Sequence, residues 1–147
     1  MFERFTKEAR VVVERAREEA LDAGSPSIEA EHLLLALARR GSPALLEVGL
    51  DHASCLEALD DELTRSLAVA GVGWDAPVRS RATLNSPRFG ASSKLALERA
   101  LRVAVERGDR RLDARHVLLG VLRAELGTVP RALEGAGIDR AALAASV

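Results

Sequence analysis

The sequence predicts an all-α fold built from two tandem copies of one helical unit. Residues 5–39 align without a gap with residues 89–123, at an offset of 84, and 11 of the 35 aligned positions are identical. The apolar residues of each copy recur with the 3.6-residue period of amphipathic helices, and no stretch shows the sustained alternation of a strand. An offset of 84 residues is too long for a solenoid of small repeats. It fits a duplicated unit of about 60 residues plus a linker.

The first copy is expected to hold four helices, over about 6–24, 29–40, 43–49 and 51–69. Thr6 and Asp51 are the residue types that cap helix N-termini, and Gly24 suits the left-handed position after a helix. The second helix is strongly apolar, and its expected buried face consists of Leu33, Leu34, Leu37 and Ala38.

The second copy repeats this order, with helices expected over about 91–107, 113–124, 128–135 and 139–146. The expected N-terminal caps of its last three helices are Asp113, Thr128 and Asp139. The segment between the copies is rich in Gly, Pro and Ser and reads as a linker. It holds Trp74, which is expected to pack on the helices rather than contact a ligand. The prediction is therefore a single domain over 1–147, with repeat one at 1–70, a linker at 71–88 and repeat two at 89–147.

The composition excludes several classes of function. The net charge is −1, from 21 basic and 22 acidic residues, which argues against a nucleic-acid-binding or membrane-binding surface. Aromatic residues make up 3% of the chain, too few for a base-stacking platform. One cysteine cannot form an internal disulfide, and the N-terminus does not resemble a signal peptide, so we expect a cytoplasmic protein.

No set of residues assembles a catalytic or cofactor site, and the chain is predicted to be a binding module without enzymatic activity or cofactor. The histidines at equivalent positions 32 and 116 are expected to be packed and hydrogen-bonded to the preceding turn. His52 and Cys55, three residues apart on a helix, are too few ligands for a metal. The acidic run Asp60-Asp61-Glu62 is expected to form a solvated helix face.

Several segments that recur in register resemble the Clp N-terminal repeat domain, the N-domain of ClpC-type AAA+ unfoldases, and in particular the actinobacterial ClpC-like form. These segments are MFERFTKEARVVV, EAEHLLLALAR with DARHVLLGVLR, and the Gly-Leu-Asp and Gly-Ile-Asp helix starts. The resemblance covers essentially the whole chain. It implies two four-helix repeats related by a pseudo-twofold axis, and a domain that docks substrates and adaptors.

The resemblance also implies a phosphoarginine pocket in each repeat, at a Gly-Thr-Glu-His motif that starts the second helix. In such a pocket, backbone N–H groups hold the phosphate and the Glu pairs with the guanidinium. The first copy here reads Glu29-Ala30-Glu31-His32, which keeps Glu31 and the histidine. The second copy carries Arg115 in place of the Glu, and its guanidinium repels that of the ligand. The resemblance therefore carries phosphoarginine binding over to Glu31 alone.

A second surface implied by the resemblance is a hydrophobic groove between the N-terminus and the first helices of the two repeats. It resembles the site that binds cyclic-peptide antibiotics of the cyclomarin type. Glu14 and Arg15 depart from the apolar residues usual there and make the edge of the groove more polar. The matching positions are Met1, Phe2, Arg10, Val13, Phe89, Lys94, Leu97 and Glu98.

The function expected from these observations is protein or peptide binding in the Clp protease system. The partners are peptides, unfolded or tagged proteins, Clp adaptors and cyclomarin-like cyclic peptides, with no nucleic acid and no membrane. The altered motifs, and a first copy that is four residues shorter after Arg39, favour a stand-alone ClpC-like protein over the excised N-domain of a full-length ClpC ATPase. An alternative of another class is a small metal-binding protein or enzyme that uses His52 and Cys55. A third is a nucleic-acid-binding helical protein, with a patch formed by Arg79, Arg81, Arg88, Arg110 and Arg111.

Overall fold

The computed structural model describes residues 2–71 and 86–147 and confirms the all-α prediction. Trp74, Arg79, Arg81 and most of the expected linker lie outside the described residues. The elements follow in the order η1 (Phe2–Arg4), α1 (Lys7–Asp22), β1 (Ser27–Ile28), α2 (Ala30–Arg40), α3 (Pro43–Glu47), α4 (His52–Val69), β2 (Arg88–Phe89), α5 (Ala91–Glu106), α6 (Ala114–Leu122), α7 (Thr128–Gly135) and α8 (Arg140–Ala145).

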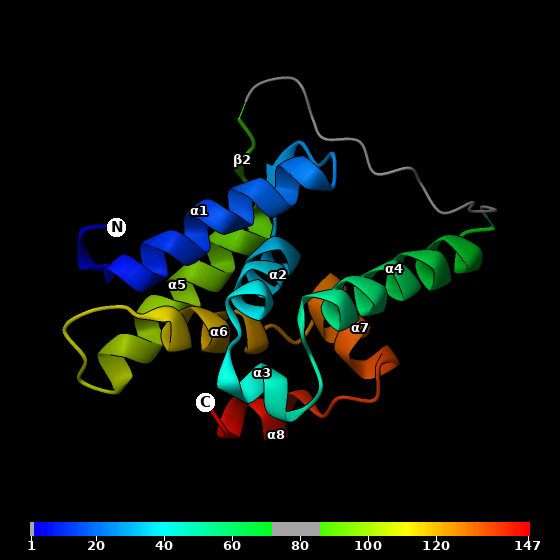
Figure 1. Cartoon of the computed structure of the whole chain (residues 1–147). Helices are drawn as coiled ribbons and strands as arrows, with labels where there is room; N and C mark the ends of the chain where they lie inside the picture. Colours follow the sequence, from blue (N-terminus) through cyan, green and yellow to red (C-terminus); the bar gives the residue numbers. More distant parts are fainter. Residues whose placement is uncertain (1, 72–85) are drawn as a thin grey trace.

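The helices of the two repeats exchange contacts across a pseudo-twofold arrangement (Figure 1). The central helices α2 and α6 contact each other. Helix α1 packs on α2 of its own repeat and on α6 of the other, and α5 packs on α6 and α2 in the same way. In Figure 1, α4 lies beside α7 on the right, so the fourth helix of repeat one rests on the third helix of repeat two.

The core consists mainly of leucine, valine and alanine from both repeats. Helix α2 buries its predicted face of Leu33, Leu34, Leu37 and Ala38, and Leu35 and Ala36 are buried as well. Such all-round burial is expected of a helix enclosed by its neighbours. In repeat two, Gly120 allows α6 to lie close to α5, because a Cβ at this position would lie 2.1 Å from the carbonyl oxygen of Ala96.

Most of the predicted helix caps are confirmed. The Thr6 side chain accepts a hydrogen bond from the Ala9 N–H at 3.2 Å, and Asp51 and Asp139 cap α4 and α8 in the same manner. Thr128 was expected to cap α7 but is its first helical residue, and Gly127, with φ of +116°, precedes it. Only glycine adopts that backbone conformation readily. Gly127 therefore takes the cap position, and the helix begins at Thr128.

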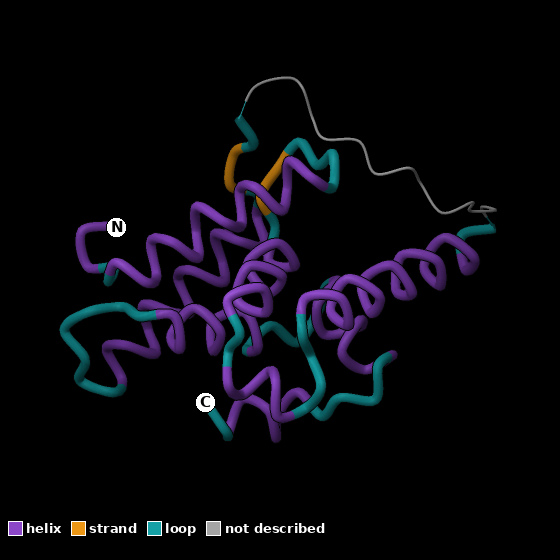
Figure 2. Tube along the Cα trace, in the orientation of Figure 1, coloured by secondary structure: helices purple, strands orange, loops and turns teal. Residues whose placement is uncertain are grey.

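Two short backbone pairings join the repeats, and the expectation of no β-structure was wrong there. Strands β1 and β2 pair in parallel, with Ile28 opposite Phe89 (Figure 2). An isolated parallel bridge joins Phe5 to Leu112. At the offset of 84, Phe5 is equivalent to Phe89 and Leu112 is equivalent to Ile28, so the two pairings are counterparts. Two-residue pairings are too short to produce a visible alternation of polar and apolar residues. In each pairing, the segment before the first helix of one repeat lies beside the loop before the second helix of the other.

Candidate peptide-binding groove

A groove on the outer face of α1 contains three of the residues expected to bind peptides. Its volume is about 430 Å³. Val13 and Phe89 supply its apolar surface, and Phe89 is half-buried whereas Val13 is 7% exposed. The complete lining consists of Glu3, Arg10, Val13, Glu14, Arg17 and Phe89.

Helical spacing explains the charged rim of this groove. Arg10, Glu14 and Arg17 stand at positions i, i+4 and i+7 of α1, so all three face the same side as Val13. All three are exposed. The sequence analysis singled out Arg10 and Val13 but did not assign Glu3 or Arg17 to the groove. The i+7 spacing from Arg10 is the signal from which Arg17 could have been found.

The remaining predicted groove residues lie outside this lining. Lys94 and Glu98 are exposed on α5, and Leu97, three residues after Lys94, is 3% exposed and belongs to the core. Met1 is outside the described residues, and the backbone of Phe2 forms part of η1. The structure thus brings together Arg10, Val13 and Phe89. The peptide-binding roles of all eight residues stay predictions.

The N-terminus of α2, where a phosphate was considered, is already engaged by the protein itself. The Ala30 N–H donates to Ser92 Oγ at 2.8 Å, and this hydroxyl lies 3.3 Å from Glu29 Oε1. Glu31 lines an adjacent pocket of about 730 Å³. Burial raises the pKa of Glu31 above its ordinary value, and the nearby Glu29 adds to that increase.

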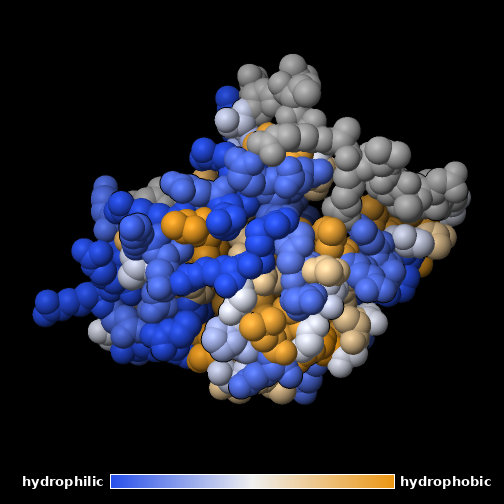
Figure 3. Space-filling view, in the orientation of Figure 1, coloured by the Kyte–Doolittle hydropathy of each residue, from blue (hydrophilic) through white to orange (hydrophobic). Residues whose placement is uncertain are grey.

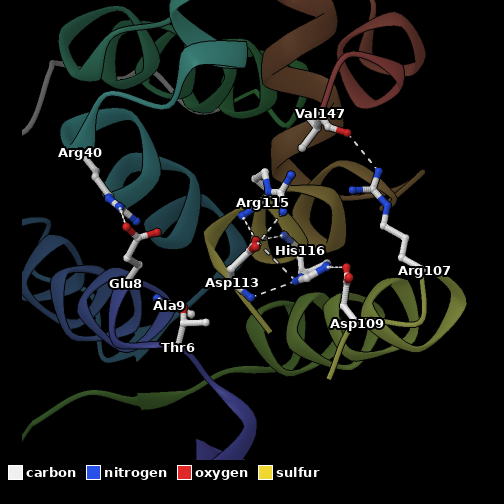
Figure 4. Close-up of polar contacts among 10 residues, drawn as sticks. All are labelled: Thr6, Glu8, Ala9, Arg40, Arg107, Asp109, Asp113, Arg115, His116 and Val147. Carbon is white, nitrogen blue, oxygen red and sulfur yellow. Dashed lines mark hydrogen bonds and ion pairs between the residues drawn. The ribbon is translucent and has the colours of Figure 1, made fainter. Parts of the chain in front are cut away.

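The equivalent helix start in repeat two is closed by a carboxylate (Figure 4). Asp113 Oδ1 accepts from the N–H of Arg115 at 2.8 Å and from that of His116 at 3.4 Å. The Arg115 guanidinium folds back onto Asp113 Oδ2 at 3.0 Å. Burial acts to raise the pKa of Asp113, but the hydrogen bonds from the side chain and the backbone N–H of Arg115 outweigh it, and the pKa lies below its ordinary value. This arrangement places a negative charge at the helix start where the family motif would hold a phosphate, in line with the expectation that repeat two has no such site.

The two equivalent histidines are packed structural residues, as predicted. His32 Nδ1 accepts the Glu29 N–H at 2.8 Å, and His116 Nδ1 accepts the Asp113 N–H at 2.9 Å. His116 is 1% exposed, and its Nε2 lies 2.7 Å from Asp109 Oδ2. Because Nδ1 accepts, the proton of the neutral ring is on Nε2, which donates to Asp109.

His52 and Cys55 stand in different environments. His52 Nε2 lies 3.0 Å from both carboxylate oxygens of Glu19, which also binds Arg39 Nε at 2.6 Å. Cys55 is 1% exposed, and burial raises the pKa of its thiol to about 11. Across residues 2–71 and 86–147, no group of three or more His, Cys, Asp or Glu side chains is placed to hold a metal ion.

No helix within those same ranges combines the length and the apolar character needed to cross a bilayer.

The acidic run on α4 departs from its prediction at one position. Asp60 and Asp61 are exposed, but Glu62 is 4% exposed. Its carboxylate binds Arg131 Nε of α7 at 2.7 Å and lies 3.5 Å from the Arg65 guanidinium. The third residue of the run therefore contributes to the junction between the repeats, because the α7 arginine gives it a partner that the sequence pattern does not show.

The chain matches a known protein family. Residues 4–83 match the model of the Clp repeat (R) N-terminal domain. The negative regulator of genetic competence ClpC/MecB of Bacillus subtilis is 30% identical over 143 residues, which cover 95% of this chain and 16% of that protein. The chain thus spans about a sixth of the length of this relative.

Two solved structures share the fold. The N-terminal domain of ClpD from Arabidopsis thaliana has a TM-score of 0.75 at 22% identity, over 99% of this chain and 93% of that chain. A complex of the ClpV N-domain with a VipB peptide has a TM-score of 0.57 at 19% identity, over 97% of this chain and 83% of that chain. Together with the family match, the duplicated helical architecture shows that the chain belongs to the Clp repeat N-terminal domain family.

Proposed function

We propose that this chain is a non-catalytic polypeptide-binding domain of the Clp system, and that the groove beside α1 is its peptide site. The partners of this class are peptides, unfolded or tagged proteins and Clp adaptors. The observation that carries the proposal is the half-buried Phe89, which with Val13 forms the apolar lining of a groove whose other lining residues are charged. Rigid aromatic area beside hydrogen-bonding groups is the surface that apolar peptide side chains and a peptide backbone require.

The difference between equivalent phenylalanines supports this role for Phe89. Phe5 is 1% exposed and belongs to the core, whereas Phe89 packs against the core and also lines the groove. The fold therefore keeps apolar aromatic area accessible at only one of these two positions. The bound VipB peptide of the ClpV N-domain supports peptide binding by this fold in a related protein.

The ligand class proposed for the groove includes cyclic peptides of the cyclomarin type, which a stand-alone ClpC-like protein in the cytoplasm would sequester. The stand-alone form agrees with the sequence changes at both helix starts, where Ser92 and Asp113 now engage the N–H groups. A reading frame that continues from Val147 into an ATPase module would instead support the excised N-domain. In that case the groove would still dock substrates or adaptors.

Calorimetric titration with a cyclomarin-like cyclic peptide tests the groove. Replacing Phe89 or Phe2 by Ala is expected to weaken binding by roughly tenfold or more, as for truncation of an aromatic anchor. Leu46→Ala is the matched control, because Leu46 on α3 is 51% exposed and does not line the groove. Unchanged binding by both phenylalanine variants would show that the peptide site lies elsewhere.

A second proposal concerns phosphoarginine at Glu31. We propose at most one site, because the α2 N-terminus has lost a free donor to Ser92 and Arg115 occupies the equivalent position in repeat two. A titration with free phosphoarginine checks this stoichiometry. Binding at two equivalent sites would contradict the role given to Arg115.

A further inference from the structure

The bridge between Phe5 and Leu112 places two arginines side by side. The Leu112 N–H donates to the Arg4 carbonyl oxygen at 2.9 Å, and the Thr6 N–H donates to the Leu112 carbonyl oxygen at 2.9 Å. In this parallel register, Arg4 lies opposite Arg111, one residue before the bridged pair. Arg110 precedes Arg111 in the same loop, and all three arginines are exposed. We call Arg4, Arg110 and Arg111 the arginine cluster.

The arginine cluster has no carboxylate partner among the residues that the structure describes, although acidic residues are close in sequence. Asp109 binds His116 Nε2 at 2.7 Å, and Asp113 binds Arg115 and the start of α6. Glu106, at the end of α5, pairs with Arg123 at 2.8 Å. The carboxylates of this loop are thus engaged elsewhere, as Figure 4 shows for Asp109 and Asp113.

The equivalent bridge in the other half of the molecule lacks this pairing of like charges. There Arg88, the counterpart of Arg4, lies opposite Ser27, the counterpart of Arg111. Like charges placed directly opposite one another on paired backbones are destabilising. The bridge itself therefore does not require two arginines, since its twofold counterpart forms with one arginine and a serine.

We propose that the arginine cluster is a docking site for an acidic segment of a partner polypeptide, one with two or more neighbouring Asp or Glu side chains. Guanidinium groups bind carboxylates through paired, charge-assisted hydrogen bonds, and adjacent arginines match adjacent carboxylates. A long polyanion fits less well, because nucleic-acid affinity grows with the number of phosphates that are neutralised, and this cluster offers three cations on a chain with net charge −1. Figure 3 shows hydrophilic atoms covering the end of the molecule where Figure 1 places the loop between α5 and α6.

This surface is separate from the proposed peptide groove, although Arg4 directly follows Glu3 of the groove lining. The inference does not depend on cyclic peptides binding at Phe89. An acidic segment that follows an apolar stretch of the same partner could contact both surfaces, and the cluster would then set the direction of the bound chain.

Fluorescence anisotropy tests the proposal with a labelled probe peptide of alternating Asp and Glu, and with a matched peptide of alternating Asn and Gln as control. We expect the intact protein to bind the acidic probe at about 50 mM salt and to lose affinity as salt is raised, because exposed ionic contacts are screened. The double variant Arg4→Gln/Arg111→Ser is expected to bind at least about tenfold more weakly. Arg88→Gln is the matched control and should bind within about twofold of the parent protein.

Two further measurements separate loss of the site from loss of the fold or of the groove. Denaturant unfolding of Arg111→Ser should give a midpoint equal to or above that of the parent, because a like-charge contact is removed. Phe89→Ala should bind the acidic probe with the affinity of the parent protein, which distinguishes this surface from the groove. The proposal is wrong if the acidic probe does not bind, if it binds no better than the amide probe, or if Arg88→Gln loses as much affinity as the double variant. It is equally wrong if a short DNA duplex or anionic vesicles bind through these arginines and the acidic peptide does not.

Discussion

Phe5 and Phe89 occupy equivalent positions in the two repeats, and only Phe5 is completely enclosed. Each forms a parallel backbone pairing with the other repeat, Phe5 with Leu112 and Phe89 with Ile28. The two phenylalanines therefore share a backbone role in the two repeats. The difference in burial separates a core residue from a residue that also lines a groove.

The two phenylalanines should therefore respond differently to truncation. Phe5→Ala is expected to cost about 3–5 kcal/mol of unfolding free energy, because it removes a fully buried aromatic ring. Phe89→Ala should cost roughly half as much, since part of its ring is already in contact with water. Urea denaturation of both variants measures the difference, and equal costs would contradict the distinction.

The central helices offer a second, symmetric test. Leu34 on α2 is 2% exposed and Leu118 on α6 is 1% exposed, at equivalent positions in the core. Leu→Ala at either position should cost about 2–5 kcal/mol through lost burial and the cavity left behind. Thermal and urea unfolding measure both, and a cost below about 1 kcal/mol at either residue would be incompatible with this packing.

Glu62 should stabilise the fold in a pH-dependent way. Burial acts to raise its pKa, but hydrogen bonds from Ser66 and Arg131, with Arg131 and Arg65 nearby, outweigh it and hold the pKa below the ordinary value of 4.5. A carboxyl with a lowered pKa stabilises the folded state above its unfolded pKa and loses that contribution as the pH falls through its folded pKa.

Glu62→Gln is accordingly expected to cost about 1–3 kcal/mol at pH 7, with the deficit shrinking below about pH 4. Denaturant unfolding at a series of pH values checks this trend. Glu57→Gln, an exposed position on the same helix, is the control and should change little. A deficit that stays constant from pH 7 to pH 3 would rule out the ionic contribution.

Glu31 should behave in the opposite sense. Its pKa is raised by burial, so the ionised carboxylate is disfavoured in the folded protein. The folded state loses stability relative to an uncharged side chain as the pH rises above the ordinary value of 4.5 and through the folded pKa. Glu31→Gln is therefore expected to raise the melting temperature at pH 7, with no difference below about pH 4. A variant that is less stable than the parent at pH 7 would indicate a stabilising partner for the carboxylate.

The repeat made the fold predictable from sequence, because a gapless match of 35 residues transfers the assignments of the first two helices from one copy to the other. The caps at Thr6, Asp51, Asp113 and Asp139 were recognisable because short polar side chains precede apolar-periodic segments. The same pattern wrongly predicted Thr128 as the cap of α7. The cap position is occupied by Gly127, and Thr128 is the first residue of the helix.

The residues of the groove were less predictable than the fold, because neighbouring residues of one helix point toward the core or toward solvent depending on their position. The resemblance named Arg10, Val13 and Phe89, and all three line one groove. It could not show that Leu97 lies in the core, nor that Glu3 completes the groove from η1. Contacts between repeats, such as Arg131 with Glu62, join residues 69 positions apart and leave no local signal in the sequence.

The binding of a polypeptide ligand at the groove is tested most directly by mapping amide chemical shifts of the labelled protein as a cyclomarin-like peptide is added. We expect the largest shift changes at backbone amides of residues 10–17 and 88–90, which carry Val13 and Phe89. Shift changes confined to the pockets beside Glu31 and Arg115, or none at saturating peptide, would contradict it.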